Sequence, residues 1–116
     1  MEKSNRAKTI KEVLVAAKWM IENIGWCQED LVIYDRNNNE EAFCATGAIS
    51  YVNGYGERSI VKDNAIRVLA NAIDGYQIHD TTTCLDTIVN FNDWSETTKN
   101  KVLSKFDKAI KLSEKI

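Results

Sequence analysis

Apolar side chains recur at helical spacing along most of the chain, and the clearest run covers residues 10–24. Its members fall on one face of a helix and predict a core-facing element: Ile10, Val13, Leu14, Ala17, Met20, Ile21 and Ile24. Thr9 and Glu12 have the spacing of a capping box, whose side-chain oxygens accept backbone N–H groups where a helix begins. Gly25 follows the run, and we expect it to end the helix in the left-handed conformation.

Two more long helices are predicted farther along the chain. One begins after Ser59 and ends at Gly75, and the other begins near Ser95 or Thr98. Their apolar faces comprise Val61, Ala65, Leu69, Ala72 and Ile73 in the first, and Val102, Leu103, Phe106, Ala109 and Ile110 in the second.

Three segments carry weaker patterns. Residues 44–54 predict a short helix with Cys44 on its apolar face. Residues 31–34 predict a short extended segment, because Val, Ile and Tyr favour strands. Residues 84–91 fit either one helical turn or a strand, and we favour a short helix that begins at Thr83.

Length and composition agree with these elements. The chain has 116 residues, of which 44% are hydrophobic and 28% charged, and it contains no proline. We therefore expect an all-α fold in a single compact domain over residues 1–116, with four to five helices and residues 1–8 frayed. The net charge of -2 gives no field that would attract nucleic acid or an anionic membrane. No apolar run approaches the ~18 residues that span a bilayer.

The three cysteines, Cys27, Cys44 and Cys84, are too few and too scattered for a disulfide framework. The N-terminal segment is polar and lacks the apolar centre of a secretory signal. We therefore expect reduced thiols and a cytoplasmic protein, in a bacterium or an infected host cell. No Cys-x-x-Cys pair occurs and the chain has one histidine, so we expect no metal and no cofactor.

One catalytic set has to be weighed. Cys27, His79 and Asn92 follow the chain order of papain-type thiol proteases, in which an imidazole activates the sulfur and an amide orients the imidazole. However, Cys27 follows a predicted helix C-terminus, where the dipole raises the pKa of a thiol. The competing interpretation is that Cys27 is a small buried residue, and we favour it.

Two other patterns are weaker still. Asp35, Asn37 and Asn39 match the first ligand positions of a calcium loop, but Glu40 replaces the required glycine and Thr46 the final glutamate. The lysines of the last predicted helix are typical of a solvated face, so nucleic-acid binding is not indicated.

Three short motifs stand together in this chain: "GWCQ" at 25–28, "CATGAI" at 44–49 and "NFNDW" at 90–94. They resemble an uncharacterised family of small bacterial and phage proteins, which carry Gly-Trp-x-Gln, Cys-Ala-x-Gly-Ala and aromatic-Asn-Asp at these places. The resemblance covers roughly residues 10–112. It implies a phage or mobile-element accessory role and brings no known activity with it.

These observations predict a small non-enzymatic binding protein. We expect it to bind a host protein, as an inhibitor of host defence. One alternative is the sequestration of a small nucleotide-like ligand, and another is a Cys27-dependent hydrolase. The expected binding residues are Trp26, Gln28, Asn92 and Asp93 around a pocket, and Trp19 and Trp94 as exposed aromatic side chains. A homodimer formed through Trp19 is a further hypothesis.

Overall fold

The computed structural model describes residues 9–115 except 31, 36–39, 53–58 and 76–79. The described residues form five helices and two strands: α1 (Ile10–Asn23), β1 (Val32–Asp35), β2 (Glu40–Phe43), α2 (Ala45–Val52), α3 (Ile60–Asp74), α4 (Thr81–Asp93) and α5 (Lys99–Ser113). The predicted all-α single domain is confirmed. Residues 1–8, which we expected to be frayed, lie outside the described residues.

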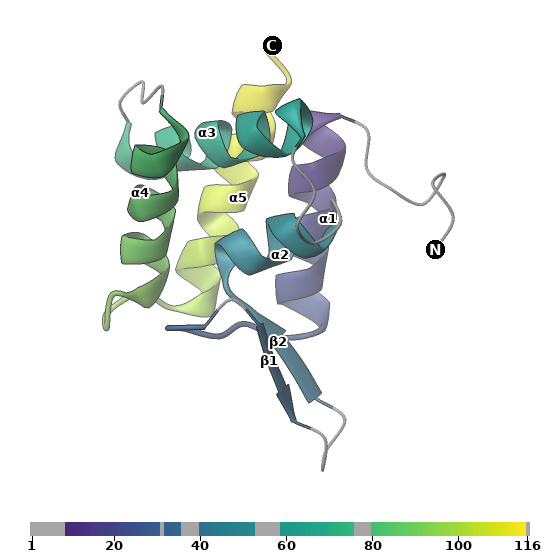
Figure 1. Ribbon diagram of the computed structural model, residues 1–116, viewed down its shortest axis with the longest axis vertical. Helices are drawn as coiled ribbons and strands as arrows, with labels where there is room; N and C mark the ends of the chain where they lie inside the picture. The colour runs from purple at the N-terminus through teal and green to yellow at the C-terminus, as the bar shows by residue number, and fades with distance from the viewer. Residues whose placement is uncertain (1–8, 31, 36–39, 53–58, 76–79, 116) are drawn as a thin grey trace.

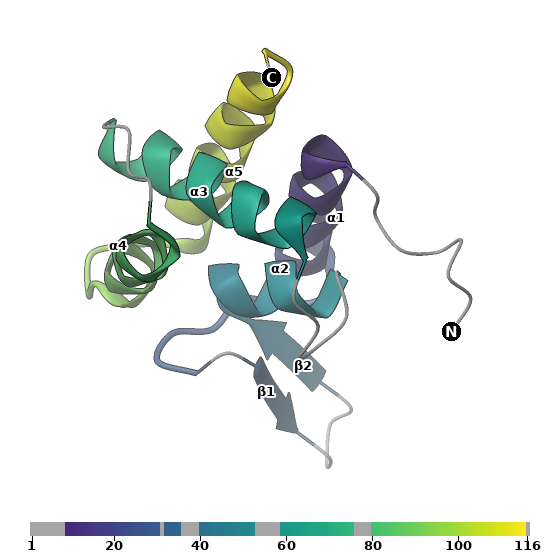
Figure 2. The ribbon, with the colours of Figure 1, turned by 45° about the horizontal axis from the view of Figure 1, so that its top comes forward.

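The helices surround one core. α1 and α5 pack side by side in opposite directions, α3 crosses the beginning of α4 and the C-terminal half of α5, and α2 lies across α1 (Figure 1). Figure 2 shows α3 passing in front of α5, with the two strands projecting from the opposite end of the molecule. The largest fully buried side chains come from most of these elements: Phe43, Phe106, Leu14, Ile21, Ile49, Leu69 and Ile88.

The predicted starts of three helices agree with the structure. Thr9, Ser59 and Thr98 are the N-caps of α1, α3 and α5, and each side chain accepts an N–H from the residue three positions on. Gly75 ends α3 with a φ of 79°, in the left-handed region.

Gly25 does not have the left-handed conformation that we predicted. The C-cap of α1 is Ile24 in a right-handed helical conformation, and its side chain is exposed rather than core-facing. Gly25 is needed for another reason: a Cβ at this position would lie 2.5 Å from the carbonyl oxygen of Glu41. The β2 backbone therefore passes too close for any side chain.

The segment 84–91 is helical, as we favoured, but its helix begins earlier than predicted. Asp80 is the N-cap of α4, and its carboxylate accepts from the Thr83 backbone N–H at 2.8 Å and from the Thr83 hydroxyl at 2.7 Å. Thr83 is thus a donor to the cap rather than the cap itself. A carboxylate at this position also complements the positive end of the helix dipole.

β1 confirms the extended segment expected near residues 31–34, whereas β2 was not predicted. The strands form an antiparallel pair in which Phe43 lies opposite Val32, and Phe43 also forms a parallel bridge with Trp26. Because Glu40–Phe43 is a strand and α2 follows it, residues 35–46 are not one calcium loop. Asn37 and Asn39 lie outside the described residues. No described helix is long and apolar enough to cross a membrane.

Candidate functional site

Asn92, near the end of α4, joins three segments that are distant in the sequence. Its side-chain oxygen accepts from the Trp26 indole N–H at 2.9 Å and from the Ala45 backbone N–H at 3.1 Å. Its amide nitrogen donates to the Cys27 carbonyl and to the Asp93 carboxylate, both at 3.0 Å. An asparagine side chain has two donors and two acceptor lone pairs, so all four are used. We call residues 25–30, 44–45 and 92–94 the Asn92 junction.

Gln28 and Asp93 hold the remaining backbone of the junction. The Gln28 amide nitrogen donates to the carbonyl oxygens of Asn92 and Trp94, both at 3.0 Å. Carbonyl groups at a helix C-terminus lack helical partners, so Gln28 caps α4. The Asp93 carboxylate accepts from the Glu29 backbone N–H at 2.8 Å, and Glu29 has a φ of 71°. This bond helps to hold a non-glycine residue in the left-handed region.

Cys27 is a buried, protonated thiol. Its sulfur donates to the Asp30 carbonyl at 3.3 Å, which requires the S–H proton. Burial raises the pKa of the Cys27 thiol to about 11, and the charges of Cys44, Asp30 and Asp93 add to this effect. Burial is thus the main cause of the raised pKa, whereas the sequence had suggested the dipole of the preceding helix. His79 lies outside the described residues, and the Asn92 side chain has no hydrogen-bonding capacity left to orient an imidazole.

Cys27 follows the C-terminus of α1, whereas Cys44 precedes the N-terminus of α2. Cys44 caps α2, although we expected it on the apolar face of that helix. Its sulfur accepts from the Gly47 backbone N–H at 3.2 Å and lies 3.2 Å from the Thr46 hydroxyl oxygen. The preferred N-cap residues are Ser, Thr, Asp and Asn, so a cysteine in this position gave no sequence signal.

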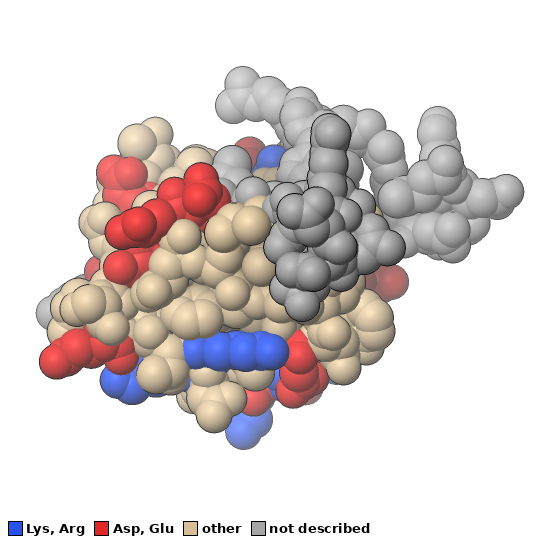
Figure 3. Space-filling model, turned by 90° about the horizontal axis from the view of Figure 1, so that it is seen from below, with Lys and Arg blue, Asp and Glu red and all other residues tan. Residues whose placement is uncertain are grey.

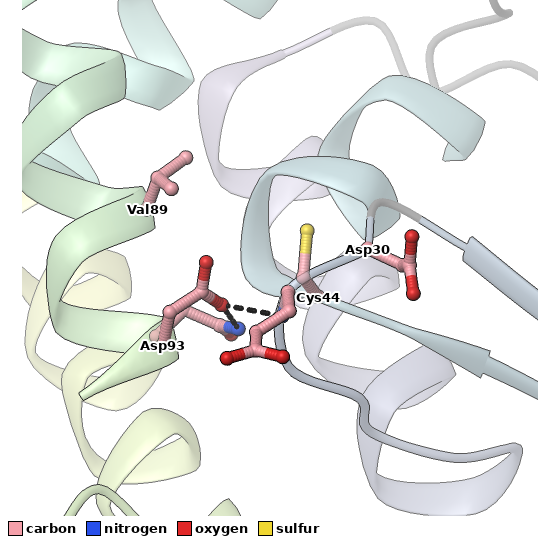
Figure 4. A pocket seen from close by; sticks show the side chains of 6 residues that line it. Asp30, Cys44, Val89 and Asp93 are labelled. Atoms are coloured by element: carbon pink, nitrogen blue, oxygen red, sulfur yellow. Dashed lines mark hydrogen bonds between the residues drawn. The ribbon is translucent and has the colours of Figure 1, made fainter. Parts of the chain in front are cut away.

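A small pocket opens beside the junction. Its volume is about 100 Å³, and it is lined by Glu29, Asp30, Cys44, Val89, Asn92 and Asp93. Val89 and Asp93, both on α4, face Cys44 across the pocket, whereas the Asp30 side chain points away from α4 (Figure 4). Pockets for drug-sized ligands measure about 300–1,000 Å³, and an engineered cavity of about 150 Å³ holds one benzene. This pocket therefore fits a group of a few heavy atoms and is too small for a nucleotide.

The pocket is acidic, and no basic residue stands among the described residues that line it. Three of its lining residues are carboxylic acids. The ion pairs of the described residues are Lys11–Glu114 and Lys18–Asp107, which lie elsewhere. On the face seen from the hairpin end of the molecule, one group of acidic side chains is separated from Lys and Arg by other residues, whereas other acidic side chains lie beside basic ones (Figure 3). A cationic group would thus meet uncompensated negative charge here.

The predicted binding residues have three different roles. Trp26 and Gln28 form hydrogen bonds within the junction and do not line the pocket. Asn92 and Asp93 form such bonds and also line the pocket. Trp94 follows Asp93 directly and its side chain is 54% exposed. Trp19 is equally exposed, at 56%, but it lies on α1 and not in the pocket lining.

Sequence reasoning missed three lining residues, Glu29, Asp30 and Val89, and it recognised Cys44 as part of a motif without assigning it to the binding residues. Glu29 and Asp30 directly follow the Gly-Trp-x-Gln motif, which was the one available signal. Val89 gave none, because isolated apolar residues on a helix are ordinary. Among the described residues, no group of three or more His, Cys, Asp or Glu is placed to hold a metal ion.

Comparison with known proteins adds a family without a known function. A family model described as a family of unknown function (DUF6197) matches residues 5–112. The searches of curated proteins and of solved structures found no match. The expectation of an uncharacterised family is thus confirmed over most of the chain.

Proposed function

Because the chain belongs to the DUF6197 family, whose function is unknown, we propose a function from its own surface: it is a small non-enzymatic binding protein. We propose that its interface is the pocket beside the Asn92 junction together with the exposed side chains of Val89 and Trp94. The group that enters the pocket is a lysine or arginine side chain of a partner protein.

The observation that carries this proposal is an uncompensated acidic pocket on a rigid support. The four hydrogen bonds of Asn92 and the two of Gln28 fix the backbone around the pocket, so little conformational entropy is lost there on binding. Trp94 and Val89 add exposed apolar surface next to the carboxylates. Aromatic anchors beside a charged pocket are typical of the residues that dominate binding energy in protein interfaces.

The two alternatives are less well supported. A nucleotide-like ligand exceeds the volume of the pocket several-fold. A Cys27-dependent hydrolase needs a thiolate, whereas Cys27 is only 7% exposed, its S–H donates a hydrogen bond to the Asp30 backbone carbonyl, and its pKa is raised to about 11.

We further propose that the partner is a host protein and that the chain is a phage or mobile-element accessory protein, which would inhibit host defence. The resemblance of its three motifs to bacterial and phage proteins supports this setting, and the small size suits a protein that acts by binding.

Site-specific photo-crosslinking in bacterial cells tests the proposal. A photoreactive phenylalanine analogue is placed at Trp94 in one variant and at Trp19 in a matched control of nearly equal exposure. We expect a discrete protein adduct at position 94 and none at position 19. The adduct should weaken at least tenfold when Glu29→Gln and Asp30→Asn are combined with the probe, because about 1.4 kcal/mol of lost attraction corresponds to tenfold in affinity.

Equal adducts at positions 94 and 19 would show that the pocket does not select the partner. An adduct at position 94 that persists unchanged in the Glu29→Gln, Asp30→Asn variant would refute the cationic group. The absence of any adduct in phage-susceptible bacteria would refute the host partner.

A further inference from the structure

Two of the three cysteines are placed next to each other by backbone pairing. Trp26 and Phe43 form a parallel bridge, in which the Phe43 N–H donates to the Gly25 carbonyl at 2.9 Å and the Cys27 N–H donates to the Phe43 carbonyl at 3.1 Å. Cys27 and Cys44 are the next residues on the two segments. Backbones bridged in this way lie about 4.8 Å apart at Trp26 and Phe43, and Cys27 and Cys44 are one residue beyond that pair, so we expect their Cα atoms within the ~4.4–6.8 Å found for disulfide-bonded cysteines.

The two sulfurs have different environments. Cys44 lines the pocket, and its sulfur accepts the Gly47 N–H at the N-terminus of α2. Cys27 is absent from the pocket lining, and its sulfur is a donor to Asp30. A reagent that enters the pocket therefore meets Cys44 first, and Cys27 is the neighbour that can react with the product. Cys84, on α4, is buried among core residues and lies outside this backbone bridge.

We propose that Cys27 and Cys44 form a redox-active dithiol, which a small hydroperoxide converts to a disulfide. The pocket volume of about 100 Å³ admits hydrogen peroxide but not a disulfide the size of oxidised glutathione. This inference is independent of the proposed partner, because it depends on the chain's own thiols.

The reaction balances in two steps. The Cys44 sulfur attacks one peroxide oxygen, the O–O bond breaks, and water leaves with the thiol proton, so Cys44 becomes a sulfenic acid. The Cys27 sulfur then attacks the Cys44 sulfur while its proton passes to the departing oxygen, the S–O bond breaks, and a second water leaves, so the step needs no standing thiolate on Cys27. The two thiols together lose two electrons, and the peroxide is reduced to two waters.

Oxidation alters the junction at a defined bond. The disulfide has no S–H group, so the Cys27 bond to the Asp30 carbonyl is lost. Asp30 is one of the pocket residues, and we expect the backbone at residues 28–30 to loosen when the disulfide forms.

The test is peroxide treatment of the intact folded protein, followed by alkylation of free thiols under denaturing conditions and digestion with trypsin. Cleavage after Lys18, Arg36, Arg58, Arg67 and Lys99 places the three cysteines on separate peptides. We expect a cross-linked pair of the Cys27 and Cys44 peptides that a reducing agent separates, with Cys84 alkylated. Cys84→Ser is the matched control and should form the same disulfide.

Two variants separate the steps. Cys27→Ser should stop at a sulfenic acid on Cys44, which dimedone labels, and Cys44→Ser should leave Cys27 reduced. The proposal is overturned if the treated wild-type protein has all three thiols free, if Cys84 appears in the cross-link, or if Cys27 is oxidised equally fast in Cys44→Ser. The wild-type digest decides the matter even if a variant does not fold.

Discussion

At the scale of single residues, Asn92 is the most consequential polar group of the described structure. It is 1% exposed, and its four hydrogen bonds reach a side chain, two backbone groups and a neighbouring carboxylate. Each buried polar group that loses its partner costs about 1–3 kcal/mol, whereas a satisfied bond contributes only about 1 kcal/mol. The cost of removing Asn92 therefore lies mainly in the groups left behind.

We predict that Asn92→Ala lowers the free energy of unfolding by roughly 2–4 kcal/mol, because it leaves the part-buried Trp26 indole N–H and the buried Ala45 amide without an acceptor. Urea denaturation followed by circular dichroism measures the change. Asn90→Ala, at an exposed position of the same helix, is the matched control and should change stability by no more than about 0.5 kcal/mol. Equal effects of the two substitutions would contradict the role of Asn92.

The Cys27 thiol gives the stability a dependence on pH. Its pKa is raised from 9.0 to about 11 in the folded protein, so its contribution is complete below pH 9 and is lost as the pH rises towards 11. The reason is that the unfolded thiol ionises in this range while the folded thiol does not. We predict that wild type loses up to roughly 2–3 kcal/mol more than Cys27→Ala between pH 8 and pH 11. Urea denaturation of both proteins at the two pH values measures this difference. Equal losses of stability in wild type and Cys27→Ala would show that the pKa of the Cys27 thiol is not raised by folding.

Gly25 shows where residue-level prediction from the sequence fails. The sequence identified the glycine and the end of α1, but it assigned the glycine to a left-handed turn. The actual requirement is the approach of the Glu41 carbonyl oxygen, which depends on a strand that the local sequence does not indicate. We predict that Gly25→Ala costs roughly 1–3 kcal/mol by thermal denaturation.

Asparagine substitutions distinguish the two explanations for a glycine. Asn tolerates the left-handed conformation, so Gly75→Asn should be nearly neutral, since a Cβ added at Gly75 would meet no atom within 4 Å. Gly25→Asn should be at least as harmful as Gly25→Ala. If Gly25→Asn lowers stability much less than Gly25→Ala, the left-handed conformation, and not the close backbone, explains the glycine.

At the scale of elements, the helices follow from local sequence and the hairpin does not. The apolar periodicity of α1, α3 and α5 and their Thr and Ser caps are local signals, and they predicted these elements within a few residues. β2 contains two glutamates and has no strand-like pattern. It is a strand because Phe43 pairs with Val32 on one side and with Trp26 on the other, and both are tertiary contacts.

The start of α4 carries a test at this scale. Two hydrogen bonds from Thr83 lower the pKa of the Asp80 carboxylate, so its contribution is present above its ordinary pKa of 3.8 and is lost as the pH falls through the lowered value. We predict that Asp80→Ala accelerates amide hydrogen exchange in the first turn of α4 at pH 6, and that Asp80→Asn, which keeps an acceptor, does so less. If all three proteins exchange alike at pH 6, Asp80 is not the cap.

At the scale of the whole molecule, the motifs that suggested a functional site form the Asn92 junction, which is structural. The pocket surface beside the junction is the candidate for binding. Sequence reasoning found residues of the Asn92 junction, because Trp26, Gln28, Asn92 and Asp93 stand in recognisable motifs. It did not find the acidic pocket, because Glu29, Cys44 and Val89 meet only after three segments have been brought together. The lining of a pocket is a tertiary property, whereas a motif is a local one.

Hydrogen exchange of the wild-type protein decides whether the Asn92 junction is a rigid support, which requires that it stay closed until the whole fold opens. The measured protons are the Trp26 indole N–H and the Ala45 amide, both bonded to the Asn92 oxygen. We predict that they exchange with the same free energy of opening as amides in the centre of α1, such as Ala17. Exchange of these two protons at the unprotected rate, while the α1 amides remain protected, would contradict the account.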